Sequence, residues 1–124
     1  MVIGFNKQFK DAILSGEKKH TIREDKHNRW KPGMKMHMAT GVRTKEYNQF
    51  YEAVCVSTQE IEIIRKSDRD RVNDTIVKVD GHMLTDIEIL HLIVYDGFNS
   101  IAEFLKFFQN GFKGKIIHWT DLKY

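Results

Sequence analysis

Glycine-containing turn signals divide this chain into short segments, and that division limits the folds open to it. Gly16, Pro32-Gly33, Asp80-Gly81, Asp96-Gly97 and Asn110-Gly111 recur along the sequence. Glycine ends helices and closes tight turns because it adopts positive φ angles without a steric penalty. We therefore expect several strands and about three helices, which must share one core.

Three segments have the apolar spacing or the terminal residues of helices. Apolar side chains in 5–14 recur at steps of three and four, and the glycine at position 16 is suited to the residue just past a helix end. Two further helices are predicted over 85–95 and 100–109. Each begins with a hydroxyl residue followed three positions later by a glutamate, Glu88 or Glu103, which is the capping-box pattern.

The remaining apolar segments are predicted to be strands because they alternate or are rich in β-branched residues. Asp-Gly at 80–81 is among the best two-residue hairpin turns. The segment 53–56, Ala-Val-Cys-Val, is expected to be buried on both sides, whereas 42–48 and 65–71 are expected to be polar, solvated connections. The expected strands are 18–23, 34–38, 50–64 as one long strand or a bent pair, the hairpin 75–79 with 82–84, and 115–119.

Length and composition indicate a single domain, residues 1–124. A chain of 124 residues has no room for a second catalytic domain, and 41% hydrophobic with 30% charged residues is typical of a globular protein. The formal net charge of +3 is only mildly basic. It permits a nucleic-acid partner without requiring one.

Cysteine usage and apolar runs predict the compartment. Cys55 is the single cysteine, which excludes an intramolecular disulfide and fits a reducing environment. No apolar run approaches the ~20 residues that a membrane helix needs. Lys7 interrupts the N-terminal stretch before a signal-peptide core forms. We therefore expect a cytoplasmic protein with no membrane partner.

The run 16–23, Gly-Glu-Lys-Lys-His-Thr-Ile-Arg, concentrates the polar chemistry of the chain. Lys18 beside the Thr21 hydroxyl in a partly dry pocket can accept its proton, and Arg23 can clamp a phosphate or a carbonyl oxygen. The alternative is an ordinary exposed strand with alternating charges. On one flat strand Lys18 and Thr21 face opposite sides, so they cooperate only if the chain bends near Gly16.

Two residues outside this run are further candidates. Asp96 stands between the end of one predicted helix and the start of the next, where backbone dipoles of opposite sense act on its carboxylate. The alternative is a turn carboxylate with local hydrogen bonds. Trp30, in a charged and turn-rich stretch, is a better candidate for stacking on a base than Trp119, which is expected to pack in the fold.

The six histidines do not form a recognisable metal motif. No pair has HExxH spacing, there is no second cysteine, and no glycine-rich phosphate loop is present. We therefore expect neither a bound metal nor a cofactor. His20 is the one histidine kept as a candidate ligand contact because it lies inside the run 16–23, and its alternative is a plain strand residue.

This run resembles the motif of the ASCH family, small domains of PUA-like fold whose members are linked to RNA and modified nucleosides. The motif is glycine, any residue, lysine, two further residues, threonine, isoleucine and arginine, here Gly16, Lys18, Thr21, Ile22 and Arg23. The preceding helix, the turn at 30–33, and Asp-Gly-Phe at 96–98 before a phenylalanine-rich helix are also similar. The resemblance thus spans nearly the whole chain, and the 80–81 hairpin with its following helix is similar to an insertion in phage or prophage members.

The resemblance implies an α+β fold, a PUA-like mixed β-barrel with flanking helices and a cleft between them. As a binding module, that cleft would hold RNA or a modified nucleoside. Its phosphate contacts would come from Lys18, Lys19 and Arg23, and Trp30 or His20 would stack on the base.

The alternative implied by the resemblance is an amidohydrolase. Some small members remove the acetyl group from N4-acetylcytidine with a lysine, a threonine and a glutamate. Here Lys18 and Thr21 match the first two, and Asp96, one methylene shorter, falls near the third. Thr21 would then be the nucleophile, Lys18 its base and Asp96 a proton-shuttling or orienting group, while Arg23 would hold the substrate oxygen.

Overall fold

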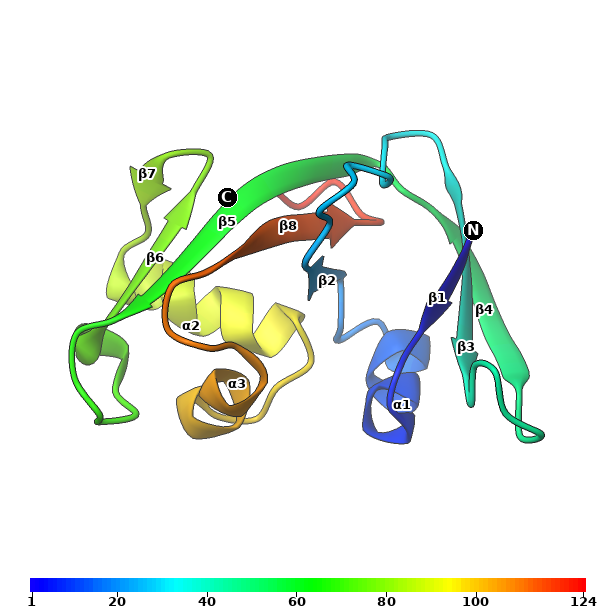
Figure 1. The fold of residues 1–124 in the computed structure, drawn as a ribbon, viewed down its shortest axis with the longest axis horizontal. Coiled ribbons are helices and arrows are strands. Elements are labelled where there is room, and N and C mark those ends of the chain that lie inside the picture. Colours follow the sequence, from blue (N-terminus) through cyan, green and yellow to red (C-terminus); the bar gives the residue numbers. More distant parts are fainter.

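The computed structural model describes residues 1–124 and has an α+β fold of two sheets and three helices (Figure 1). In chain order the elements are β1 (Val2–Gly4), α1 (Lys7–Ser15), β2 (His20–Arg23), β3 (Lys35–Thr40), β4 (Asn48–Val54), β5 (Ser57–Arg65), the 3-10 turn η1 (Val72–Asp74), β6 (Thr75–Val79), β7 (His82–Met83), α2 (Asp86–Tyr95), α3 (Ile101–Phe107) and β8 (Phe112–His118).

The strands form two open sheets rather than the expected barrel. One sheet has the order β1-β3-β4, with β1 and β3 parallel, and the other is antiparallel with the order β2-β8-β5-β6-β7. The outer strands β1 and β2 share no backbone pairing. Instead Arg23 Nη2 donates a hydrogen bond to the carbonyl of Gly4 at 2.6 Å. A side chain thus spans the place where backbone pairing would have closed the two sheets.

The expected bent strand pair at 50–64 is confirmed as β4 and β5. The amide of Cys55 donates to Met34, the residue before β3 of the smaller sheet, and the amide of Val56 donates to His118 in β8 of the larger one. The chain therefore passes from one sheet to the other within two residues. Cys55 is buried as expected, but Val54 and Val56 are 49% and 43% exposed, so burial on both sides was wrong. Val54 ends an edge strand, and nothing covers its outer face.

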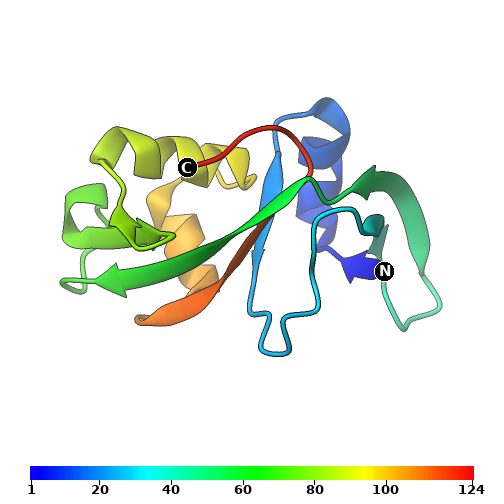
Figure 2. The same ribbon diagram turned by 90° about the horizontal axis from the view of Figure 1, so that it is seen from above.

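Helix α2, helix α3 and the C-terminal segment pack against the larger sheet, and Asp96 and Tyr124 meet His20 on the same face of it. Helices α2 and α3 lie beneath β5 and β8, and residues 119–124 turn back beside β8 (Figures 1 and 2). Ile116 and Ile117 point to opposite faces of β8, and both are fully buried. The core is one continuous cluster that joins these strand residues to Phe104 and to Phe9 of α1.

Several local predictions are confirmed. Asp80 and Gly81 have φ angles of 50° and 87°, the left-handed pair that a tight hairpin turn needs. Helix α1 ends on Gly16 at φ 85°, although it begins at Lys7 rather than Phe5 because Asn6 is extended. The Thr85 capping box is complete, whereas Ser100 receives the amide of Glu103 without the reciprocal bond. None of the three helices has the length and apolar character needed to cross a membrane.

Removing the Thr85 hydroxyl should destabilise the protein, because it would leave the amide of Glu88 at the start of α2 without its partner. We expect Thr85→Ala to lower the free energy of unfolding by about 1 kcal/mol in urea denaturation. Thr85→Ser keeps the hydroxyl and should retain most of the stability. Equal losses in both variants would contradict a role for the cap.

Candidate functional site

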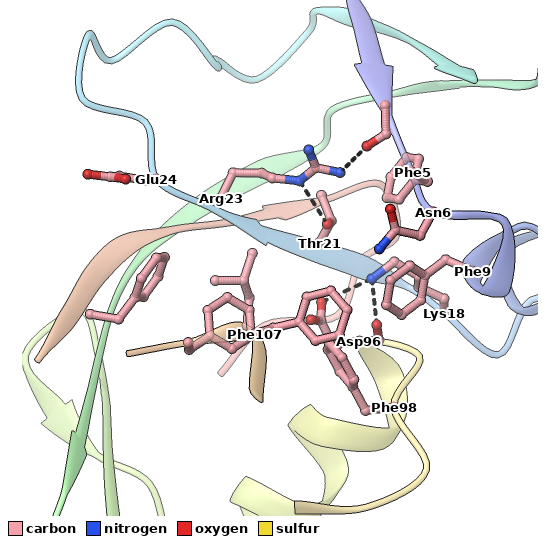
Figure 3. Close-up of a pocket in the computed structure, with 14 residues that line it drawn as sticks. Phe5, Asn6, Phe9, Lys18, Thr21, Arg23, Glu24, Asp96, Phe98 and Phe107 are labelled. Atoms are coloured by element: carbon pink, nitrogen blue, oxygen red, sulfur yellow. Dashed lines mark hydrogen bonds and ion pairs between the residues drawn. The ribbon is translucent and has the colours of Figure 1, made fainter. Parts of the chain in front are cut away.

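A cavity of about 300 Å³ lies among α1, β2, the end of α2 and the start of β8 (Figure 3). Its volume is at the lower end of the ~300–1,000 Å³ typical of small-molecule sites. Phenyl rings form much of the wall, and charged or polar groups gather beside them. The rings are Phe5, Phe9, Phe98, Phe107, Phe108 and Phe112, and the polar groups are Asn6, Lys18, Thr21, Arg23, Glu24 and Asp96.

The bend required to bring Lys18 to Thr21 is present. Strand β2 begins only at His20, so Lys18 lies before the strand and does not follow its alternation. Its amide donates to Ala12 at the end of α1, and the amide of Lys19 donates to Tyr95 at the end of α2. These bonds hold the turn after Gly16 against two helices. Lys18 and Thr21 therefore line the same cavity.

Lys18 and Asp96 form a buried ion pair, each only 2% exposed. Lys18 Nζ donates to the backbone carbonyl of Asp96 at 2.5 Å and lies 3.3 Å from Oδ1. The same nitrogen lies 4.9 Å from the centre of the Phe9 ring. Burial lowers the pKa of Lys18, and the Asp96 carboxylate opposes that shift. The amine consequently loses its proton more easily than an exposed lysine does.

Gly97 makes room for this pair. Its φ angle is 90°, and a Cβ at this position would lie 3.1 Å from Lys18 Cδ and 3.2 Å from Phe9 Cδ1. A larger residue would therefore be strained and would crowd the lysine stem. Asp-Gly-Phe at 96–98 ends α2, supplies the carboxylate, leaves space for Lys18, and anchors Phe98 in the cavity wall.

His20 contacts the Asp96 carboxylate but does not line the cavity. Its ring is fully buried, with Nδ1 3.0 Å from Asp96 Oδ1 and Nε2 2.7 Å from the Tyr124 hydroxyl. Burial lowers the pKa of His20 and favours the neutral ring. We assign the ring proton to Nδ1, which donates to the carboxylate, so Nε2 accepts from Tyr124. His20 is thus placed to orient Asp96 and is not available to stack on a ligand.

Arg23 carries a charge that no carboxylate pairs. Nη2 donates to Gly4 and Nε donates to Thr21 Oγ1 at 3.3 Å, and both acceptors are neutral. Burial lowers the pKa of Arg23, although an arginine keeps its proton in proteins. With Lys18 paired to Asp96, and Glu24 paired to Lys26 at 3.3 Å, this guanidinium leaves the cavity with a surplus positive charge. Such a site attracts an anion or a carbonyl oxygen.

Besides His20, two further predicted ligand residues lie outside the cavity. Lys19 Nζ donates to the carbonyl of Gly16 at 3.1 Å and lies 5.8 Å from the centre of the Tyr95 ring. Trp30 is 9% exposed, belongs to the core, and borders a different hollow. The phenyl walls were missed because phenylalanines at helical spacing indicate a core. Tyr124 was missed because no local pattern marks it.

Comparison of the chain with protein-family models, with curated proteins and with solved structures finds no match in any of the three. No group of three or more histidine, cysteine, aspartate or glutamate side chains is arranged to hold a metal ion. A functional proposal for this chain therefore rests on the cavity itself.

Asp96→Asn should lower the pKa of Lys18 further, because the carboxylate is the charge that opposes the effect of burial. The amide has the same shape and leaves the backbone carbonyl in place to receive Lys18. The Lys18 pKa can be followed through its ¹³Cε chemical shift by NMR, with the distant, exposed Asp68→Asn as a control. A Lys18 pKa that rises or stays constant in Asp96→Asn would contradict this account of the pair.

Proposed function

We propose that the cavity binds the base of a nucleoside, either free or as one unstacked residue of an RNA. The observation that carries the proposal is a phenyl-walled cavity with Lys18, Arg23 and Asp96 at its polar end. Aromatic faces stack on any base, and fixed donors and acceptors read the edge of the base. A flat, polar-edged ring fits such a lining better than an aliphatic ligand or a bare anion.

The polar groups favour a base that presents a carbonyl oxygen beside an amino group. Lys18 and Arg23 donate hydrogen bonds, and Arg23 Nη1 makes none within the protein. Asp96 accepts on Oδ1, while Oδ2 has no hydrogen-bond partner in the protein. Donors next to a carboxylate acceptor complement cytosine and guanine edges, in which a carbonyl and an amino group lie close together. N4-acetylcytidine keeps the base carbonyl and adds a second one.

We also propose that the chain is an ASCH domain with a PUA-like fold. The motif residues Lys18, Thr21 and Arg23 and the distant Asp96 line one cavity, as the resemblance implies. Two sheets with facing outer strands bridged by an arginine correspond in this proposal to a partly open barrel.

Arg23→Ala should weaken nucleoside binding by about tenfold or more, because it removes charge-assisted hydrogen bonds in a site sheltered from water. Calorimetric titration with cytidine, guanosine and N4-acetylcytidine measures the affinity. The matched control is Arg69→Ala, an exposed arginine that borders none of the hollows described here. With RNA as the ligand, affinity should also fall as salt rises. Failure of the three nucleosides, of their monophosphates and of RNA to bind would reject the proposal.

The alternative function is an amidohydrolase, and the burial of Lys18 in the cavity that Thr21 also lines favours it. A lysine whose pKa is lowered by burial can accept the Thr21 proton as Oγ1 attacks the acetyl carbonyl. The C–N bond then breaks, and the released amine takes the proton that Lys18 accepted. Water finally hydrolyses the acyl-threonine to acetate. In the resting structure Lys18 bonds Asp96 and makes no hydrogen bond to Thr21, so its amine must turn toward the hydroxyl before reaction.

If the protein is this amidohydrolase, it should release cytidine and acetate from N4-acetylcytidine. Lys18→Ala and Thr21→Val should then each reduce turnover at least ~100-fold, since each removes a reacting group. Chromatographic separation of cytidine from its acetylated form gives the rate. Lys19→Ala serves as the neighbouring control, because that lysine does not line the cavity and its amine bonds the carbonyl of Gly16. Absence of turnover, or turnover insensitive to both substitutions, would exclude the mechanism.

A further inference from the structure

A second hollow adjoins the cavity on the other side of Arg23. Its volume is about 470 Å³, and it lies between β1 and residues 24–30 of the connection that follows β2. Gly4, Arg23 and Glu24 border both spaces. The Arg23 side chain, which bridges the two sheets, therefore stands between the cavity and this second hollow.

The carboxylates of the second hollow are already paired. Glu24 Oε1 lies 3.3 Å from Lys26 Nζ. Asp25 accepts the amides of Arg29 and Trp30 and lies 3.4 Å from Lys115 Nζ. These contacts pair the negative charges of Glu24 and Asp25 at the edge of the hollow. They do not involve the side chain of Arg29, which is exposed and has no ion-pair or hydrogen-bond partner.

Two guanidinium groups thus face this hollow without an anion. The Arg29 fork is free, and Arg23 has no carboxylate within 4.0 Å, its acceptors being Gly4 and Thr21. In Figure 3 the third nitrogen of Arg23, Nη1, points away from Thr21. A buried or half-buried cation left unpaired is costly, and a planar guanidinium binds phosphate through two parallel hydrogen bonds.

We propose that the second hollow holds the phosphate of a nucleotide whose base occupies the cavity, with Arg23 and Arg29 on the phosphate oxygens. This inference rests on the proposed nucleoside function and narrows it: the ligand is a phosphorylated nucleotide, free or within RNA, rather than a bare nucleoside. Continuity through Arg23 supports one extended ligand, because the Arg23 side chain borders both spaces together with Gly4 and Glu24.

The test compares cytidine and N4-acetylcytidine with their 5′- and 3′-monophosphates in calorimetric titrations of the whole chain. The wild-type protein should bind one of the monophosphates about tenfold more tightly than the matching nucleoside, the gain typical of a charge-assisted contact. The isomer preferred identifies the side of the sugar that faces Arg29. Raising the salt concentration should reduce this preference.

Arg29→Gln should bring the ratio of monophosphate to nucleoside affinity close to one, while Arg69→Gln, which removes the same charge elsewhere, should preserve it. Because the Arg29 side chain is exposed and makes no hydrogen bond or ion pair, its loss should not disturb folding, and circular dichroism checks this. If nucleosides bind but phosphate adds nothing, the phosphate subsite is wrong and the nucleoside proposal stands. If both arginine variants lose the preference equally, the attraction is general and the subsite is again wrong. If neither nucleosides nor monophosphates bind, the phosphate subsite is wrong, and the nucleoside proposal falls too when RNA also fails to bind.

Discussion

The buried ion pair between Lys18 and Asp96 is the interaction on which the site depends. It joins the turn after α1 to the end of α2, segments 78 residues apart in the chain. Removing two charges from water costs several kcal/mol per ion, and their attraction repays this only with good geometry and further hydrogen bonds. Lys18 obtains one such bond from the backbone carbonyl of Asp96, and the carboxylate obtains another from His20. A pair of this kind is a weak source of stability, so a role in binding or chemistry is a better reason for its presence.

Hydrogen bonds that position the Lys18–Asp96 pair continue through His20 to Tyr124. Tyr124 holds His20 through its hydroxyl, and Gln59 fixes Tyr124 by accepting its amide and donating to its carbonyl. Gln59 also contacts His118 Nε2 at 2.9 Å. Burial lowers the pKa of His118 to about 3, so this ring is neutral at neutral pH. With both imidazoles neutral, no second cation competes with Lys18 for the Asp96 carboxylate, and the proton of His20 stays on the side facing it.

The sequence predicts a structural feature well when that feature depends on residues close together in the chain. The Asp80-Gly81 turn and the Thr85 cap depend on neighbours within four residues, and both are confirmed. Val54 is exposed because β4 is an edge strand of its sheet. The apolar composition of the segment 53–56 does not reveal that position, so the prediction of burial was wrong. Trp30 was expected at the ligand because its neighbours are charged, but those neighbours point outward while its ring joins the core. Residue type indicated the chemistry, and only the tertiary arrangement determined which groups share a space.

The open junction between the two sheets explains why the cavity and its charge occur together. Had β1 and β2 paired through their backbones, no side chain would be needed between them and the space would be closed. Arg23 substitutes for that pairing with a bond to Gly4, and Phe5 packs against its guanidinium at 4.9 Å. The same side chain therefore spans the gap, borders both hollows and retains a charge that the protein does not neutralise. A ligand that supplied the missing anion would strengthen the contact between the sheets, so binding and closure of this junction are expected to be thermodynamically linked.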